Sequence, residues 1–412
     1  MKSNFLKALV AVVLAFGMCA CGNKKNDEAA SLMKYRELGS TGIQVSEIGI
    51  GCGAFAHMDT AQARVYMDLA IDSGINYIDI YDANPVVRGN IGYALEGRRD
   101  KMVIQGHLGS YWDGEHYART RDVELAKKGF NDLLTLLKTD HIEVGMIHIA
   151  DNLQEWDSII NSPFMDYVNQ LKAEGKVQHI GMSSHNAEVA LAAAKSGLVE
   201  VIMFSLNPAF DRVDAQKSVW DTSSYSTMLP GIDPVRVELY NYCAQHHIAI
   251  TVMKAFGGRD GWLLKEGSPL GAALTPVQCL AYALANPAVA VAITGADNVE
   301  QLQESLNYLT ATDEEKDYSS VLNTNSQSGQ PAECTYCGHC SPCPVGIDIA
   351  QVNRLLDKAA GQSKVPADVM AEYKALEHHA SECTGCGGCE NRCPFDVPVR
   401  EKMKQAVEVF GM

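Results

Sequence analysis

Basic residues are scarce in this chain. Its 412 residues include 34 Lys and Arg against 50 Asp and Glu, so the formal net charge is −16. A nucleic-acid-binding protein needs a basic face to contact phosphates, and this charge balance argues against that class. Charged residues make up 20% and hydrophobic residues 47% of the chain, which is typical of a folded globular protein.

Long apolar runs are also lacking. The uncharged run Ala8–Ala20 is too short to span a bilayer, and no other segment is long enough. Lys2 and Lys7 precede this run and small residues end it, as in a secretory signal peptide. We therefore expect residues 1–20 to be a signal peptide and residues 21–33 to be a polar tether.

The end of this leader resembles a bacterial lipoprotein signal, because the small residue Ala20 immediately precedes Cys21. The resemblance implies a lipid on Cys21 and a location in the bacterial cell envelope. The membrane would then be contacted through that N-terminal lipid only. An ordinary cleaved signal peptide is the alternative, and the protein is cytoplasmic if the leader is not used.

Eight short apolar runs alternate with amphipathic helical patterns between Tyr35 and Leu322. The runs are Ile48–Gly51, Tyr77–Tyr81, Met102–Gly106, Val144–Ile149, Val177–Met182, Glu200–Ser205, Ile248–Met253 and Val289–Thr294. Eight strand–helix units predict an α/β fold in which residues 34–322 form a (β/α)8 TIM barrel. A doubly wound open sheet is the main alternative, but no G-x-G-x-x-G motif follows the first strand.

Polar side chains stand at or just beyond the carboxyl ends of most of these predicted strands. They are Asp79, Tyr81, Asp82, His107, His148, Ser183, Ser184, His185, Asn207 and Lys254. A single Ser or Asp at the end of a strand is often a helix cap. Because the carboxyl ends of barrel strands share one rim, the whole set predicts an active site there.

The order of several motifs resembles the aldo/keto reductase family. Residues 38–51 read L-G-x-T-G-x-x-V-S-x-I-G-x-G, as at the opening of such an enzyme. The match continues at Gly74–Asp79, Ile147–His148, Gly175–Ser183, Val252–Lys254 and Ile293–Ala296. The resemblance covers the whole middle segment. It implies a barrel that binds NAD(P) without a Rossmann fold and reduces carbonyls by hydride transfer.

This chain departs from the catalytic tetrad of that family, which consists of Asp, Tyr, Lys and His. Asp79 and His148 stand at the Asp and His positions, but Asn84 replaces the Tyr and His107 replaces the Lys. An Asn cannot donate a proton with a useful pKa. The candidate acids are therefore His107, with Asp79 fixing its tautomer, and Tyr81. The alternative is a barrel that has kept its fold and lost the reaction.

The same resemblance implies a set of cofactor-binding residues along the later strands. They are Ser183, Ser184, Met253, Lys254, Gly295, Ala296, Asn298 and Glu304. Gly295–Asn298 opens a helix whose amide groups suit a phosphate. No Arg follows on that helix before Lys316, so nothing favours the additional phosphate of NADP.

The thirteen Cys are distributed unevenly, and most lie in residues 323–412, beyond a polar linker. Two runs contain Cys334, Cys337, Cys340, Cys343, Cys383, Cys386, Cys389 and Cys393. The second run has the bacterial ferredoxin spacing C-x2-C-x2-C-x3-C-P, and the first differs only in its last gap. We predict two [4Fe-4S] clusters, with the fourth Cys of each run ligating the cluster of the other run.

Zinc and disulfides are the alternatives for these cysteines. Zinc sites commonly use Cys pairs separated by a longer loop, whereas an exported location favours disulfides. Cys residues at x2 spacing do not readily pair in a row, so we favour clusters. Helical patterns at Ile349–Ala360 and Ala367–His379 indicate a small, mainly helical ferredoxin-like domain. The whole chain resembles a subgroup of aldo/keto reductase-like proteins with such a tail.

Together these features predict an iron–sulfur oxidoreductase that acts on a carbonyl or sugar-like small molecule. Electrons would pass through the two clusters to or from a redox partner that the sequence does not identify. The alternative is a non-catalytic electron-transfer or binding protein on a degenerate barrel. Tyr81 and His107 discriminate between the two, because the non-catalytic hypothesis is favoured if both point away from the rim.

Overall fold

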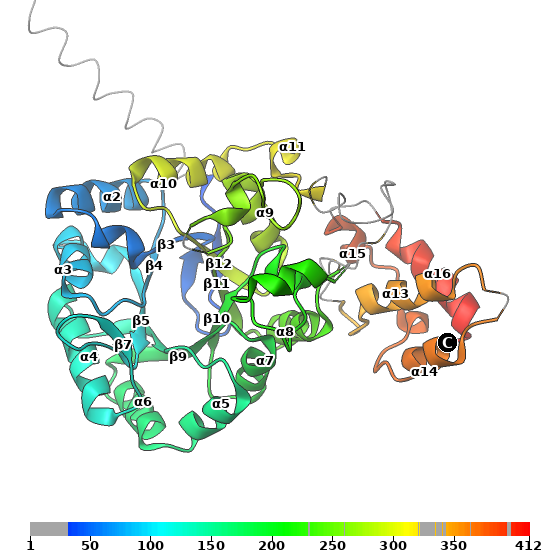
Figure 1. Ribbon diagram of the computed structural model, residues 1–412, viewed down its shortest axis with the longest axis horizontal. Coiled ribbons are helices and arrows are strands. Elements are labelled where there is room, and N and C mark those ends of the chain that lie inside the picture. Colours follow the sequence, from blue (N-terminus) through cyan, green and yellow to red (C-terminus); the bar gives the residue numbers. More distant parts are fainter. Residues whose placement is uncertain are drawn as a thin grey trace, which may run out of the picture.

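The structure is a computed structural model that describes residues 32–229, 231–258, 260–319, 321, 334, 340, 343–362, 364–393 and 397–412. Eight parallel strands close into a barrel, and the predicted (β/α)8 fold is confirmed (Figure 1). These strands are β3 (Ile48–Gly51), β4 (Tyr77–Ile80), β5 (Val103–Leu108), β8 (Ile142–Ile147), β9 (Val177–Ser184), β10 (Val201–Ser205), β11 (Ala249–Met253) and β12 (Val289–Thr294). The last strand pairs with the first, with Ala292 opposite Ile48.

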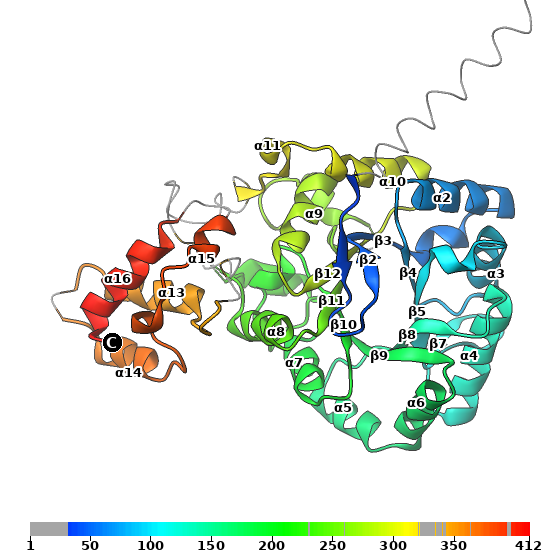
Figure 2. The same cartoon turned by 180° about the vertical axis from the view of Figure 1, so that it is seen from behind.

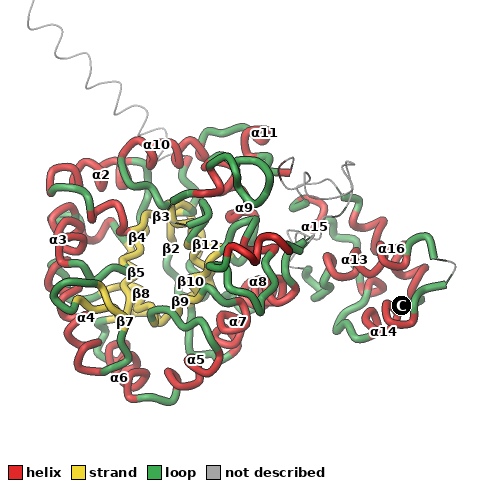
Figure 3. Tube along the Cα trace, viewed as in Figure 1, coloured by secondary structure: helices red, strands yellow, loops and turns green. Residues whose placement is uncertain are grey.

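Helices form the outer layer of the barrel, and Figure 3 shows them as a red ring around the yellow strands. They are α2 (Thr60–Asp72), α3 (Pro85–Ala94), α4 (Val123–Leu137), α5 (Leu153–Ile160), α6 (Pro163–Ala173), α7 (Ala187–Lys195), α8 (Pro234–Gln245), α9 (Pro276–Ala285), α10 (Val299–Leu306) and α11 (Asp313–Lys316). Several begin at side-chain caps, for example Asp122 of α4, which accepts from Leu125 N.

Strand residues alternate between the barrel interior and the surrounding helices. Tyr77, Val144 and Met203 belong to the buried interior cluster, whereas Ile78 and Ile104 pack in the outer core. A short hairpin of β1 (Tyr35–Glu37) and β2 (Gln44–Ser46) precedes the barrel, and its residues Leu38 and Val45 join the interior cluster. The amino end of the barrel is therefore filled, which leaves the carboxyl end for a site.

A second hairpin was not predicted. It consists of β6 (Ser110–Trp112) and β7 (Tyr117–Arg119) and follows strand β5. Ser110 Oγ donates to the carbonyl of Tyr81, and Arg119 donates to the carbonyl of Ile149. Because Tyr81 follows β4 and Ile149 follows β8, these bonds tie the hairpin to the carboxyl end of the barrel on both sides.

The C-terminal region is mainly helical, as predicted. Its helices are α13 (Ile349–Ala359), α14 (Ala367–Lys374), α15 (Gly388–Asn391) and α16 (Val399–Phe410). Tyr373 stacks on Phe410 with ring centroids 4.0 Å apart, which joins α14 to α16. In both views this region lies beside the barrel, on the side of α8 (Figure 2).

One helix is shorter than the sequence predicted. The pattern over Ala367–His379 continues past Lys374, but α14 ends there and the chain turns into a short 3-10 helix at Ala380–Glu382. His379 N bonds to the Glu382 carboxylate, which caps that second helix instead of extending the first.

Three cysteines outside the cluster runs are structural. Cys52, Cys243 and Cys279 are all buried in the outer core of the barrel. None of the helices within the described ranges is both long and apolar enough to cross a membrane. The predicted signal peptide and Cys21 lie outside the described residues.

Candidate active site and cluster-binding region

A cavity of about 370 Å³ opens at the carboxyl end of the barrel strands. Residues from several strand ends and the following loops line it, including Asp79, Tyr81, His107, Tyr117, His148, Ser183, His185, Trp220, Met253, Lys254, Phe256 and Asp297. Aromatic and ionisable side chains are therefore mixed in its walls. Such a lining suits a small polar molecule that also presents apolar faces.

Three candidate catalytic residues form a continuous series at the base of this cavity. His107 Nε2 lies 3.0 Å from Asp79 Oδ1, and His107 Nδ1 lies 2.5 Å from His148 Nδ1. All three side chains are at most 2% exposed. A buried carboxylate needs hydrogen-bond donors, and the imidazole of His107 supplies one of them to Asp79.

A buried glutamine supplies the other donor to Asp79. Gln105 Nε2 lies 2.6 Å from Asp79 Oδ1, while its Oε1 accepts from Tyr77 at 2.7 Å and Thr251 at 3.1 Å. The donors on Oε1 fix which end of the Gln105 amide faces Asp79. The orientation of the carboxylate is therefore set by residues of β4, β5 and β11.

The local sequence of β5 explains why His107 faces inward. Its neighbour Gly106 points outward, where an added Cβ would lie 2.7 Å from Leu133 Cδ2 of α4. The glycine lets α4 pack closely on the strand, and alternation then turns Gln105 and His107 into the barrel. This is one position at which the absence of a side chain is required by packing.

His148 is held in its neutral form. Burial lowers the pKa of His148 well below its ordinary value, and the nearby His107, Arg121 and Arg119 add to the effect. Arg121 also donates to the carbonyl oxygen of His148 at 2.8 Å, which fixes the backbone at the end of β8.

Sequence reasoning missed Tyr117, which lies on β7 and lines the cavity. Its hydroxyl is hydrogen-bonded to His148 Nε2, and its ring meets that of Tyr81 edge-on with centroids 6.2 Å apart. Burial raises the pKa of Tyr117 to about 12. No motif spacing in the sequence predicts a role for Tyr117. The sequence feature that could have indicated one is its position in an insertion that directly follows a predicted strand.

Tyr81 and His107 both line the cavity, which favours the enzyme hypothesis over the degenerate barrel. Asn84, at the position of the family's Tyr, is not among the residues that line the cavity. Its side chain caps α3 by accepting from Val86 N at 2.9 Å. Asn84 therefore has a structural role in this chain, and the phenol at the site comes from other segments.

A second polar group lies just beyond the ends of the neighbouring strands β8 and β9. His185 Nδ1 is 3.0 Å from Asp151 Oδ2, and the His185 ring meets Trp220 edge-on. Lys254 Nζ lies 5.1 Å from the centre of the Trp220 ring. Burial alone would raise the pKa of Asp151, but hydrogen bonds from His185 and Ser184 hold it below its ordinary value. Sequence reasoning had also missed Asp151 and Trp220.

Most of the predicted cofactor-binding residues reach the cavity. Ser183, Met253, Lys254, Gly295 and Ala296 line it. Three do not: Ser184 bonds to Asp151, Asn298 caps α10, and Glu304 is exposed on that helix. The exposed Asp297 lines the cavity just before α10, where the sequence had suggested a phosphate.

Five of the seven described cysteines of the C-terminal region gather around a second, small cavity. Its walls include Cys340, Cys343, Cys383, Cys386 and Cys389. Four of these five are the set predicted to hold one cluster, and Cys340 belongs to the other set. Gly385 and Gly387, with φ values of +69° and +77°, turn the chain between the second-run cysteines. A cubane is held by one thiolate per iron, so this donor set and its turns fit a cluster.

The other predicted cluster set is described only in part. Cys334 Sγ accepts from Asn353 at 3.5 Å, and Arg392 donates to the carbonyl of Cys340. Cys337 lies outside the described residues. In the described part of the chain, no three His, Cys, Asp or Glu side chains converge on a position for a single metal ion.

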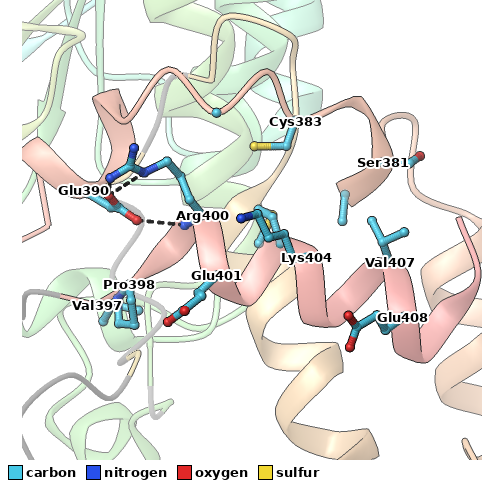
Figure 4. Close-up of a pocket in the computed structure, with 13 residues that line it drawn as sticks. Ser381, Cys383, Glu390, Val397, Pro398, Arg400, Glu401, Lys404, Val407 and Glu408 are labelled. Carbon is cyan, nitrogen blue, oxygen red and sulfur yellow. Dashed lines mark hydrogen bonds and ion pairs between the residues drawn. The ribbon is translucent and has the colours of Figure 1, made fainter.

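A groove of about 1030 Å³ runs along α16 next to these cysteines (Figure 4). Cys383, Arg400 and Lys404 line it together with the carboxylates Glu401 and Glu408. Glu390 pairs with Arg400 across the groove wall, and Cys386 is exposed nearby. The edge of the cysteine region is thus accessible from solvent.

Comparison with known proteins agrees with this description. Residues 47–273 match the aldo/keto reductase family and residues 330–397 match the 4Fe-4S dicluster domain. The first match spans more than half of the chain, so this protein belongs to the aldo/keto reductase family, with a 4Fe-4S dicluster domain at its C-terminal end.

Individual proteins are similar to different shares of this chain. The uncharacterized oxidoreductase YqkF of Bacillus subtilis is 29% identical over 297 residues, which are 68% of this chain and 92% of that protein. L-galactose dehydrogenase of Arabidopsis thaliana is 24% identical and covers 42% of this chain and 56% of its own length. The holo form of an aldo-keto reductase from Bacillus halodurans has the same fold, with a TM-score of 0.54, 22% identity, and coverage of 72% of this chain and all of that structure.

Proposed function

We propose that the barrel interconverts an alcohol and a carbonyl on a small, sugar-like molecule. The observation that carries this proposal is the buried series of Asp79, His107 and His148, which lines a cavity of about 370 Å³ with polar and aromatic walls. Such a series is suited to moving a proton to or from a substrate oxygen. The relative named L-galactose dehydrogenase supports a hydroxylated substrate.

A nicotinamide cofactor is the proposed hydride carrier, in keeping with the family. Ser183, Met253, Lys254, Gly295 and Ala296 would hold it, since all line the same cavity. Bound there, a nicotinamide supplies two-electron hydride chemistry. The Asp297 carboxylate would repel an additional phosphate at the start of α10, so we propose NAD in preference to NADP.

Two [4Fe-4S] clusters are proposed for the C-terminal domain. Cys334, Cys337, Cys340 and Cys393 would hold one, and Cys343, Cys383, Cys386 and Cys389 the other. Such clusters supply one-electron transfer when bound. The exposed Cys386 and the groove beside Cys383 support an approach of the unidentified redox partner from this side.

The experiment is anaerobic purification of the full chain with iron and sulfide analysis, followed by a panel of sugars and carbonyls with NAD and NADP. We expect about eight irons and eight sulfides per chain, and turnover with NAD. An iron content near zero would contradict the clusters. Absence of turnover and of nicotinamide binding, in the wild type and in an Asn84→Tyr, His107→Lys variant, would favour the degenerate barrel.

Envelope anchoring through Cys21 is a separate proposal. A short apolar run, a small residue and a polar tether support lipidation at this position. In a bacterial host that processes lipoproteins, the wild type should fractionate with membranes and Cys21→Ser should be released. A variant that stays membrane-bound and retains Met1 would contradict the proposal.

A further inference from the structure

The hydroxyl of Tyr117 is joined to the buried carboxylate Asp79 through two imidazoles. Tyr117 contacts His148 Nε2, His148 Nδ1 lies 2.5 Å from His107 Nδ1, and His107 Nε2 lies 3.0 Å from Asp79 Oδ1. All four side chains line the cavity, and Tyr117 is the least buried of them. The inner end is held by Gln105 in the barrel interior.

The direction of every hydrogen bond in this series follows from its inner end. An ionised Asp79 can only accept, so His107 carries its proton on Nε2 and leaves Nδ1 as an acceptor. His148 must then donate from Nδ1, which leaves its Nε2 to accept from the Tyr117 hydroxyl. With two neutral imidazoles, each donor in the series meets one acceptor.

The surrounding residues fix the position of the Tyr117 phenol relative to the His148 imidazole. Ser110 and Arg119 attach the Tyr117 hairpin to the carbonyls of Tyr81 and Ile149. Arg121 binds the carbonyl of His148 itself. The hairpin and the end of β8 are therefore fixed to each other by bonds on both sides of the Tyr117–His148 contact.

We propose that Tyr117 is the acid–base residue of the barrel and that His148, His107 and Asp79 form a relay for its proton. The inference rests on the proposed alcohol–carbonyl function. In alcohol oxidation, the substrate carbon loses a hydride to an oxidised nicotinamide while its hydroxyl proton passes to the Tyr117 oxygen. The Tyr117 proton passes to His148 Nε2, the His148 Nδ1 proton to His107, and the His107 Nε2 proton to Asp79.

This sequence of transfers balances, because one proton enters at Tyr117 and one carboxylate is neutralised at Asp79. Carbonyl reduction is the reverse, starting from protonated Asp79. A phenol with a raised pKa cannot ionise alone near neutral pH. In the relay Tyr117 does not have to ionise alone, because it gives its proton to His148 as it receives one from the substrate.

The kinetic test compares Tyr117→Phe with Tyr111→Phe in the full chain. Tyr111 lies on the same hairpin, opposite Ala118, and is not among the residues that line the cavity. We expect Tyr117→Phe to lower kcat about 100-fold or more with little change in KM, and Tyr111→Phe to change kcat less than about 2-fold. If the wild type is active and Tyr117→Phe has the same kcat, Tyr117 is not the acid–base residue. The proposed function is unaffected by that result.

A spectroscopic test does not require turnover. In protein labelled with 15N-histidine, the His148 resonances should show a neutral ring protonated at Nδ1, and Tyr117→Phe should shift the Nε2 resonance because that nitrogen loses its donor. A ring protonated at Nε2 overturns the relay. If the His148 tautomer is the expected one but the protein turns over no alcohol or carbonyl, the proposed function is wrong. The acid–base role of Tyr117 is then wrong as well.

Discussion

His107 Nδ1 and His148 Nδ1 face each other at 2.5 Å, so one imidazole must donate and the other must accept. If either ring gained a second proton, both of its nitrogens would become donors and this contact would be lost or reversed. The site is therefore built for two neutral imidazoles, and its integrity depends on pH.

The folded protein should lose stability as pH falls below about 6.5, the ordinary pKa of histidine. The pKa of His148 is lowered in the folded state, so below that value the unfolded chain binds a proton that the folded chain does not. The stabilisation is present above pH 6.5 and is lost progressively toward the folded pKa. Urea unfolding of wild type and His148→Asn, followed from pH 7.5 to 5.5, measures this contribution. Equal pH dependence in both proteins would contradict it.

Turnover should depend on His107 more than on Tyr81. His107→Phe disconnects His148 from Asp79 and should lower kcat about 100-fold or more, the usual size of acid–base effects. Tyr81→Phe keeps the edge-on contact with Tyr117 and should retain most activity. Steady-state kinetics with one accepted substrate decides the matter. The opposite order, with His107→Phe active and Tyr81→Phe inactive, would refute this assignment.

Asn84 should matter for stability and not for chemistry. Loss of its cap on Val86 N in Asn84→Ala should lower the free energy of unfolding by about 1 kcal/mol, while Asn84→Asp should preserve it. Both variants should keep wild-type kcat. A large loss of kcat in Asn84→Asp, at unchanged stability, would give Asn84 a part in the reaction.

Cross-ligation predicts which cluster is damaged when a fourth cysteine is removed. Cys343→Ala should alter the EPR signal of the cluster on Cys383, Cys386 and Cys389, because Cys343 lines the cavity with those three. Cys279→Ala, at a buried barrel position, is the matched control and should leave both signals unchanged. If Cys343→Ala affects only the cluster of its own run, cross-ligation is wrong.

The fold and the inner part of the site were accessible from the sequence. Short apolar runs that alternate with helical patterns predict the eight strands, and the polar residues at the ends of these runs include Asp79, His107 and His148. Tyr117 and Gln105 were not accessible, because their roles depend on contacts between distant segments. Tyr117 acts from an inserted hairpin that no periodicity marks, and Gln105 is one of many inward-facing strand residues until Asp79 is seen beside it.

The bond between Gln105 and Thr251 joins residues separated by 146 positions, on opposite walls of the barrel. The Gln105 amide that bonds to Asp79 therefore gains its second donor, in addition to Tyr77, only when the seventh barrel strand has docked. A chain still emerging from the ribosome, or truncated before β11, would contain Asp79, His107, Tyr117 and His148 but would lack this second donor. The last support of the buried carboxylate is therefore added late in synthesis.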